Sequence, residues 1–280
     1  MVREIRSLKG IELGVLYRAF VDAFSDYVVS LQPTEDQLRE LFKRRGVDLS
    51  ISAGAFVEGE LVGFTFNAMD QYQNLATVYD AGSGVVPTHR RQGISDAIFR
   101  FLTPLLKNAG GEQYLLEVIE SNLPAVKLYE KIGFRFSRKF DVFVGSVQGI
   151  VPASAFEIRE VEPNWEYWKT IWDWEPSWQN SSASIQRSSK EKLFRGVFLQ
   201  NRCIGYGIIY PESGDVPQFC IEREFRGRGA GKSLIAALQT LTGAQLRFIN
   251  LDSSSEATIR LIESCGVPRF GSQLEMRMKL

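Results

Sequence analysis

The residues best suited to chemistry lie in two short turns that are rich in glycine and arginine. The first turn reads Arg90, Arg91, Gln92, Gly93, Ile94 and Ser95, and the second reads Arg226, Gly227, Arg228, Gly229, Ala230 and Gly231. Each turn precedes a stretch with the apolar spacing of an amphipathic helix. Glycine has no Cβ and a helix N-terminus presents backbone N–H groups, so an anion can approach such a turn closely. Both turns are therefore candidate phosphate-binding loops.

The spacing within the second turn excludes two common phosphate-binding designs. Gly231, Lys232 and Ser233 fit the end of a P-loop, but the earlier glycine that this motif requires falls on Arg226. A dinucleotide fingerprint that starts at Gly227 and Gly229 requires its third glycine at Lys232. Neither motif is complete, so the turns indicate another kind of anion site.

The composition narrows the class of protein. The chain has 280 residues, and its 33 basic and 33 acidic side chains give a net charge of zero, which argues against a nucleic-acid or anionic-membrane partner. Three cysteines without metal-like spacing and a single histidine predict no metal site and no disulfide framework. The N-terminus is too charged for a signal peptide, and no apolar run reaches the ~20 residues of a membrane-spanning helix. We therefore expect a cytoplasmic protein with reduced thiols.

The two turns occupy the same place in two similar series of elements. Each series begins with a hairpin, whose turn is at Glu58 and Gly59 in the first half and at Asn201 in the second. A strand, the glycine-rich turn, an amphipathic helix and a second strand follow, and a shorter helix then ends at Gly133 or Gly266. The order predicts a mixed α/β fold that is duplicated in tandem. We expect domains at residues 1–145 and 156–280 with a linker at 146–155.

The order of motifs resembles that of a known family. Residues 85–95 resemble the acetyl-CoA signature of the GNAT N-acetyltransferase superfamily, in which a strand runs into Arg/Gln-x-x-Gly-x-Gly/Ala and a helix, although this turn closes with Ser95. Glu117, Asn122, Tyr129 and Gly133-Phe134 are similar to the strand and helix that follow in that family. The second half matches the first motif through residues 226–231, but it has Ser255, Ile262 and Val267 in place of Asn122, Tyr129 and Phe134. The resemblance implies two tandem GNAT-like domains, each a mostly antiparallel sheet with helices on both faces.

The resemblance also implies an activity, namely transfer of an acetyl group from acetyl-CoA, as co-substrate, to an amine of a small molecule or peptide. The two turns would bind the diphosphate, and a backbone N–H near Val85 and Val86 would stabilise the oxyanion that the thioester carbonyl becomes. Tyr129 would give a proton to the leaving thiolate, and Asn122 lies two helical turns before it on the same face. Asp80 or Glu117 would take the proton of the amine.

Each of these residues also has a structural interpretation. Tyr129 could be a packed tyrosine, Asn122 a plain N-cap and Asp80 a hydrogen bonder at a strand end. Arg90 could be a surface charge, or could have a phosphate-binding or structural role. The five tryptophans, all between residues 165 and 178, predict buried packing first and an aromatic wall for an amine acceptor second.

The two halves have complementary strengths. The first half keeps the tyrosine and asparagine, whereas the second keeps the more complete glycine turn. Since transition-state groups determine the rate, we expect the first domain to be catalytic and the second to be a degenerate copy. The alternative is a non-catalytic CoA-binding sensor or scaffold. The chain is expected to be a monomer or a homodimer.

Overall fold

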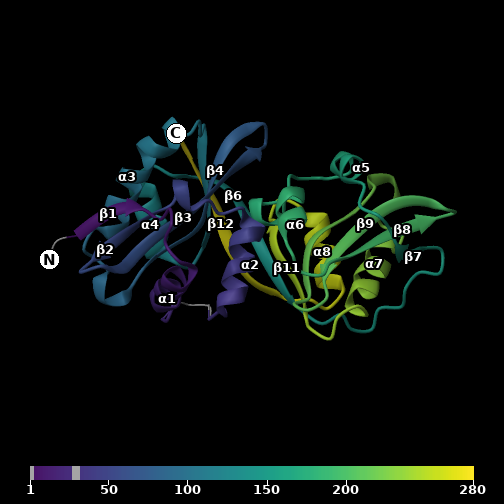
Figure 1. Cartoon of the computed structure of the whole chain (residues 1–280). Helices are drawn as coiled ribbons and strands as arrows, with labels where there is room; N and C mark the ends of the chain where they lie inside the picture. Colours follow the sequence, from purple (N-terminus) through teal and green to yellow (C-terminus); the bar gives the residue numbers. More distant parts are fainter. Residues whose placement is uncertain (1–2, 27–31) are drawn as a thin grey trace. The chain divides into compact units, whose positions relative to one another are not determined.

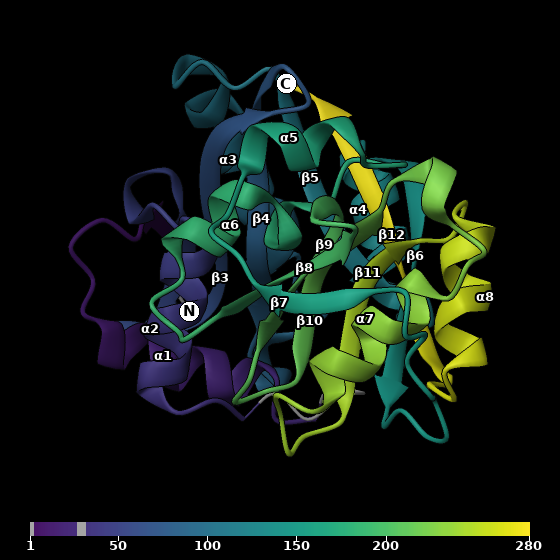
Figure 2. The ribbon, with the colours of Figure 1, turned by 90° about the vertical axis from the view of Figure 1, so that its right-hand side faces the viewer.

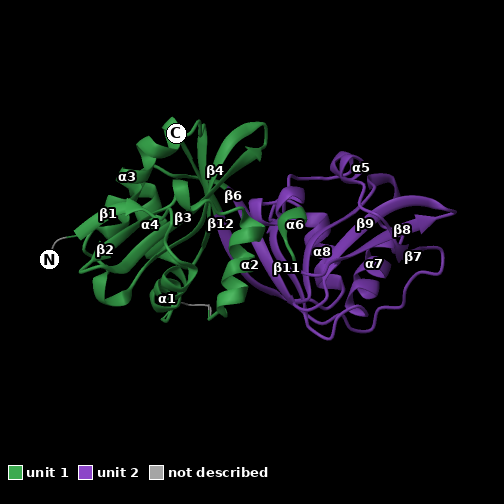
Figure 3. Ribbon diagram, viewed as in Figure 1, with its two compact units in different colours: residues 1–137, 186–189, 275–280 green, residues 138–185, 190–274 purple. Residues whose placement is uncertain are grey.

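A computed structural model describes residues 3–26 and 32–280, which form twelve strands and eight α-helices (Figure 1 and, turned by 90°, Figure 2). The chain divides into two compact units (Figure 3). Unit 1 comprises residues 1–137, 186–189 and 275–280, and unit 2 comprises residues 138–185 and 190–274. The predicted mixed α/β fold with a mostly antiparallel sheet is confirmed.

Unit 1 is built on a sheet whose strands follow the order β1-β2-β3-β4-β5. Neighbouring strands are antiparallel except β4 and β5, which are parallel. The elements, in chain order, are β1 (Arg3–Ser7), α1 (Leu13–Ala23), α2 (Glu35–Arg45), β2 (Ala53–Val57), β3 (Glu60–Tyr72), β4 (Leu75–Val85), α3 (Ile94–Asn108), β5 (Gln113–Ile119) and α4 (Leu123–Ile132).

Helices cover both faces of the unit 1 sheet. A Cβ on Gly63 of β3 would lie 2.7 Å from Ile94 of α3, whereas the ring of the next residue, Phe64, packs on Phe20 of α1 at 6.0 Å. Because successive residues of a strand point to opposite faces, α1 and α3 lie on opposite faces of the sheet.

Unit 2 repeats this plan with the strand order β6-β11-β10-β9-β8-β7, in which only β10 and β11 are parallel neighbours. Its elements, in chain order, are β6 (Arg135–Gly145), β7 (Glu157–Glu160), α5 (Trp165–Thr170), α6 (Ser182–Arg187), β8 (Leu193–Leu199), β9 (Arg202–Tyr210), β10 (Asp215–Ile221), α7 (Ala230–Gln239), β11 (Leu246–Asp252), α8 (Glu256–Ser264) and β12 (Arg269–Lys279). A few of the first residues of β6 and the last residues of α6 and β12 are counted with unit 1.

Both faces of the unit 2 sheet are also covered by helices. The Tyr206 ring of β9 stacks on Trp168 of α5 at 4.0 Å. A Cβ on the next residue, Gly207, would lie 3.1 Å from Leu238 of α7. Helices α5 and α7 therefore cover opposite faces.

The last strand of each half packs in the sheet of the other unit. Residues 138–145 of β6 belong to unit 2, where Gly145 pairs with Leu246 of β11. Residues 275–280 belong to unit 1, where the N–H of Leu280 donates to the carbonyl of Glu112 at 3.0 Å. The compact units are therefore not continuous in sequence, and we keep 1–145 and 156–280 as the proposed extents of the two copies.

Local chemistry explains where the elements begin and turn. Thr34 and Gln37 form a capping box at the start of α2. The expected hairpin turns are also present, because Glu58 and Gly59 have φ of 52° and 86°, and Gln200 and Asn201 have φ of 48° and 67°. Two successive left-handed residues form the turn that best matches the twist of paired strands.

We predict that Gly205→Ala destabilises the protein by about 1–3 kcal/mol, since overpacking in a well-packed interior costs this much. A Cβ on Gly205 would lie 2.5 Å from the carbonyl oxygen of Cys220, so the backbone of β9 or β10 must move. Gly243→Ala is the matched control, because its Cβ would meet no atom within 4 Å. Urea unfolding measures both variants, and equal midpoints would contradict the packing argument.

Candidate functional site

In unit 1, the parallel strands β4 and β5 separate before they end. Their pairing covers Thr77, Val78 and Tyr79 of β4, and Tyr79 with Leu115 is the last pair in the part of the chain that the structure describes. Ala81 forms a bulge in β4, because Asp80 pairs with Asn67 of β3 whereas Gly82 pairs with Phe66. Because a bulge bends its strand, β4 diverges from β5 toward the first glycine turn.

The first turn is open to solvent and shaped for an anion. Arg91 and Gly93 both have left-handed backbones, with φ of 60° and 72°. Helix α3 begins at Ile94 without a side-chain cap among the described residues, so the N–H groups of its first turn, which includes Ser95, are available to a ligand. A Cβ on Gly93 would meet nothing within 4 Å, and Gln92 is also exposed. These residues fit a diphosphate at the start of α3.

The second turn has the same backbone but is partly covered. Gly227 and Gly229 have φ of 74° and 95°, and Arg228 between them is exposed. A Cβ on Gly229 would lie 3.1 Å from Ala153, whose N–H donates to the Ser233 hydroxyl of α7 at 2.9 Å. The segment expected as a linker therefore lies against this turn.

Gly231, at the start of α7, has a packing explanation. A Cβ there would lie 2.6 Å from Leu261 of α8, so the missing side chain lets α7 and α8 approach closely. Its neighbour Ala230 is buried in the core of unit 2. The close contact between α7 and α8 therefore explains why position 231 is a glycine.

The first arginine of each turn braces the strand that precedes it. The Arg90 guanidinium donates to the Val85 carbonyl at 3.0 Å and to both carboxylate oxygens of Asp26 at 2.7 Å. Arg226 does the same with Ile221 at 2.7 Å and Asp173 at 2.6 Å. The structural alternative for Arg90 is thus favoured, and the Arg90 guanidinium holds the pKa of Asp26 below its usual value. The sequence analysis identified neither Asp26 nor Asp173 as a partner. The one signal was that Arg90 and Arg226 occupy matching positions in the two turns.

Of the two backbone N–H groups proposed for the oxyanion, one is already used. The N–H of Val86 donates to the Val62 carbonyl of β3 at 2.9 Å. Successive residues of an antiparallel strand direct their N–H groups to opposite sides, so the N–H of Val85 points toward the gap beside β5. Val85 is the better of the two candidates.

Helix α4 carries Tyr129 and Asn122. The half-buried Tyr129 ring packs edge-on against Phe99 of α3 at 6.0 Å and against Phe134 at 5.8 Å. The Asn122 side chain accepts the N–H of Ala125 at 3.3 Å, so it is the N-cap of α4. Lys131 of α4 pairs with Asp96 in the first turn of α3 at 3.3 Å. The contacts place the face of α4 that carries Tyr129 against α3.

The two carboxylates proposed as bases differ in their surroundings. Asp80 is buried at the β4 bulge, and its oxygens accept the Gly82 N–H at 2.9 Å and the Ser83 hydroxyl at 2.7 Å. Burial raises the pKa of Asp80 to about 6. Glu117 of β5 is half-buried and accepts the Tyr79 hydroxyl at 2.9 Å. The bonds to the bulge favour a structural role for Asp80 and make Glu117 the better candidate base.

The tryptophans of unit 2 divide between the two interpretations of their cluster. Trp168 and Trp178 are each 2% exposed and belong to the packed interior. Trp165 packs edge-on against Trp168 at 5.3 Å. Trp172 and Trp174 instead line a hollow beside β10 and β11. Packing accounts for the first three, and Trp172 and Trp174 are also packed against the unit 2 core where they line the hollow.

Residues 3–26 and 32–280 contain neither a metal-binding cluster nor a membrane-spanning helix. No group of three or more His, Cys, Asp or Glu side chains there is arranged to hold a metal ion. None of the helices in these residues is both long enough and apolar enough to span a bilayer.

The chain belongs to the acetyltransferase (GNAT) family, whose model matches it twice, at residues 16–134 and 157–267. The chain is thus a tandem member of this family, and its acetyltransferase class follows from the two matches. The tandem GNAT protein from the clavulanic acid biosynthesis pathway shares its fold, with a TM-score of 0.76 and 13% identity over 99% of this chain and 98% of that one. A GCN5-related N-acetyltransferase from Sphaerobacter thermophilus has a TM-score of 0.72 and 15% identity over 99% and 95% of the two chains.

Two curated proteins are similar over shorter stretches. The uncharacterized N-acetyltransferase YobR of Bacillus subtilis is 39% identical over 70 residues, which are 25% of this chain and 26% of that protein. Streptothricin acetyltransferase of Streptomyces lavendulae is 30% identical over 86 residues, or 31% of this chain and 43% of that protein. The chain thus aligns with less than half the length of either relative.

We predict that the stability difference between the wild type and Asp80→Asn depends on pH. Burial raises the pKa of Asp80 from 3.8 to about 6, so the folded state binds this proton more tightly than the unfolded chain. The protonated Asp80 therefore contributes its full stabilisation below about pH 4, and the wild type loses roughly 3 kcal/mol of unfolding free energy relative to the variant as the pH rises from about 4 through about 6. Urea unfolding across this range measures the difference, and a constant difference would contradict the prediction.

Proposed function

We propose that the protein is an acetyl-CoA-dependent N-acetyltransferase, that it transfers the acetyl group directly to an amine of a small molecule or peptide, and that unit 1 is the catalytic unit. The observation that carries this proposal is the contrast between the two turns. Both α3 and α7 begin without a side-chain cap among the described residues, but Gly93 is exposed, whereas Gly229 is half-buried against Ala153. The phenol of Tyr129 has the fully buried Ile262 as its counterpart in unit 2.

The first turn and α3 would bind and orient the co-substrate. The backbone N–H groups of residues 93–95 face the start of α3, where the helix dipole favours negative charge. The left-handed backbones at Arg91 and Gly93 help to turn these groups toward one ligand. When bound there, acetyl-CoA supplies an activated acetyl thioester. The N–H of Val85 would hydrogen-bond the carbonyl oxygen and stabilise its developing charge.

Two side chains would move protons. Tyr129 would donate its hydroxyl proton to the departing sulfur, because a phenol with an ordinary pKa near ~10 can protonate a thiolate whose conjugate acid is near ~8.5. Glu117 would accept the proton that the amine releases, directly or through water. Its contact with the Tyr79 hydroxyl at 2.9 Å fixes the orientation of the carboxylate.

The proposed acceptor is an amine, in keeping with the chemistry of the family. The similarity to an enzyme named for streptothricin makes a small amine a reasonable first substrate class to test. The first assay therefore measures acetyl transfer from acetyl-CoA to a panel of small amines and short peptides.

We predict that Tyr129→Phe lowers kcat by about 10²–10⁴-fold, the usual contribution of a positioned general acid, and leaves the Kd for CoA unchanged. The ring contacts with Phe99 and Phe134 need no hydroxyl, so the fold is retained. Steady-state kinetics and calorimetry measure the two effects. An unchanged kcat would remove Tyr129 from the chemistry.

We predict that Gly93→Asp raises the KM for acetyl-CoA at least tenfold, since it places a carboxylate beside the diphosphate. Gly227→Asp is the matched control in the other turn. Both glycines have a left-handed φ, 72° and 74°, and a Cβ on either would meet nothing within 4 Å. Aspartate tolerates this backbone better than most residues.

The control should change turnover much less. If Gly227→Asp alone abolishes transfer, unit 2 is the catalytic unit. Binding of CoA without transfer to any amine of the panel would favour the sensor or scaffold alternative.

A further inference from the structure

The first strand of unit 1 contacts the glycine turn through one side chain. The Arg3 guanidinium of β1 donates from Nη1 to the carbonyl oxygen of Gln92 at 2.8 Å. Both residues are exposed, and 89 positions separate them in the sequence. Within residues 3–26 and 32–280, this is the one hydrogen bond or ion pair of the Arg3 side chain. Arg3 is therefore held at the turn by a backbone carbonyl.

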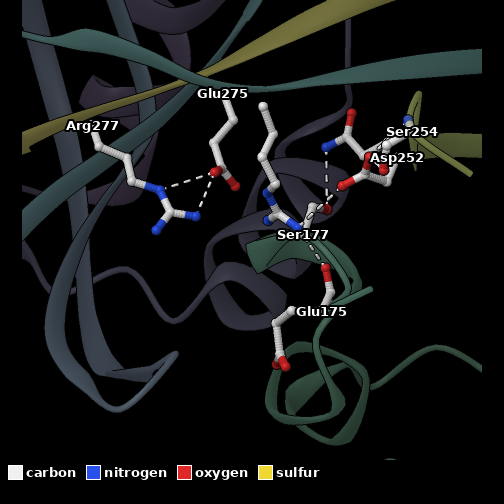
Figure 4. Close-up of polar contacts among 8 residues, drawn as sticks. Glu175, Ser177, Asp252, Ser254, Glu275 and Arg277 are labelled. Carbon is white, nitrogen blue, oxygen red and sulfur yellow. Dashed lines mark hydrogen bonds and ion pairs between the residues drawn. The ribbon is translucent and has the colours of Figure 1, made fainter. Parts of the chain in front are cut away.

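Other arginines of unit 1 are bound by carboxylates. Arg277 donates to the buried Glu275 from Nε at 3.0 Å and from Nη2 at 2.6 Å (Figure 4). Arg90 of the turn donates to both carboxylate oxygens of Asp26 at 2.7 Å. Arg3 has no such partner among the described residues, so an ion pair does not explain its position.

The carbonyl that Arg3 binds belongs to the peptide group between Gln92 and Gly93. The C=O and the N–H of a trans peptide point in opposite directions, and the described residues contain no cis peptide bond. The N–H of Gly93 therefore points away from Arg3. It has no acceptor in the part of the chain that the structure describes, so it is available to a ligand on that side.

The glycine makes this peptide group prone to turn over. A flip changes the φ of the following residue, and glycine adopts positive and negative φ about equally well. Gly93 has a φ of 72°, and a Cβ there would meet nothing within 4 Å, so packing does not hold the group either. A flipped group would present its carbonyl to an anion, which repels it. Arg3 opposes the flip, because a guanidinium has N–H donors and no acceptor and so binds the carbonyl and not the N–H.

Unit 2 has no arginine at the corresponding position. Glu4 of β1 and Glu157 of β7 correspond, because each pairs with the phenylalanine at the register shift of the next strand. The residue before Glu157 is Phe156, which packs against the core of unit 2. A phenylalanine, which cannot donate a hydrogen bond from its side chain, therefore stands where unit 1 has Arg3.

The matching peptide group of the second turn also lacks a donor. Its carbonyl belongs to Arg228, which precedes Gly229, and it accepts no hydrogen bond from the described residues. Ala153 lies against Gly229 instead. The contact made by Arg3 is thus a feature of the unit with the exposed turn.

We propose that Arg3 is a positioning residue that keeps the N–H of Gly93 turned toward the diphosphate of the co-substrate. The proposal rests on the proposed function, because that function assigns acetyl-CoA as the ligand of the turn. Arg3 acts through the peptide group, from the side opposite to the ligand. Its loss lowers the fraction of the protein in which the turn is ready to bind, and the Kd rises as that fraction falls.

Arg3→Met removes the donor and keeps an unbranched side chain. The Kd for CoA should rise at least about threefold by calorimetry, the rise expected when the competent fraction falls to about one third. The KM for acetyl-CoA should rise as well, whereas kcat should stay unchanged, because bound donor is already in the correct turn. Arg6→Met is the matched control on the same strand, since Arg6 lies over the Phe56 ring at 4.0 Å and pairs with Glu4 at 3.5 Å. It should leave the Kd unchanged.

The amide signal of Gly93 reports on the peptide group directly. Isotope-labelled glycine gives a nuclear magnetic resonance signal for each glycine amide, and Gly93→Ala identifies the one from position 93. In ligand-free Arg3→Met, relaxation dispersion should appear at Gly93, because the group exchanges between two orientations. Saturating CoA should remove it by selecting one orientation. The wild type should show no dispersion at Gly93, and Gly229 should show no difference between the two proteins.

The two measurements separate the ways in which the proposal fails. Unchanged affinity in Arg3→Met would show that the contact does not serve binding. Weaker binding without dispersion at Gly93 would show that Arg3 acts on the ligand by its charge and not through the peptide group. An equal loss in Arg6→Met would have the same meaning. If the wild type binds no CoA, the proposed function fails, whereas dispersion in the ligand-free variant still tests the hold of Arg3 on the turn. Thermal unfolding verifies that each variant folds.

Discussion

Two parallel strands that stop pairing partway along their length are the feature on which both units depend. A bulge in β4 and another in β10 bend these strands away from β5 and β11. In each unit, the separation leaves backbone groups and side chains at the strand ends with space beside them, and the glycine turn follows directly. Without the bulges, the ladder would continue, and neither the Val85 N–H nor the hollow of unit 2 would have room for a ligand.

The same plan has been used differently in the two copies. Unit 1 keeps an exposed turn and a tyrosine on α4, which are features that suit acetyl transfer. In unit 2, Ala153 lies over the turn, Ile262 fills the tyrosine position in the core, and Trp172 and Trp174 line the space between the strands. The two copies therefore share their backbone geometry but differ in the side chains around the turn and the separated strands.

Much of the fold follows from local sequence rules. The capping box at Thr34, the left-handed turns at Gly59 and Asn201 and the strand at Gln113–Ile119 each depend on residues near one another in sequence. The arrangement of the site was harder to predict from the sequence, because its contacts join residues that are far apart in the chain. The brace between Arg90 and Asp26, the hydrogen bond that occupies the Val86 N–H and the contact of Ala153 with the second turn join residues that no short motif connects.

The exchange of last strands links synthesis of the chain to completion of its sheets. Unit 1 gains residues 275–280 only after the whole of unit 2 has been made, whereas the strand that pairs with β11 is already present when β11 emerges. Until then, the edge of β5 in the nascent protein lacks its neighbour, and an exposed edge is prone to pairing with other chains. A break between the two copies would therefore separate each sheet from one of its own strands.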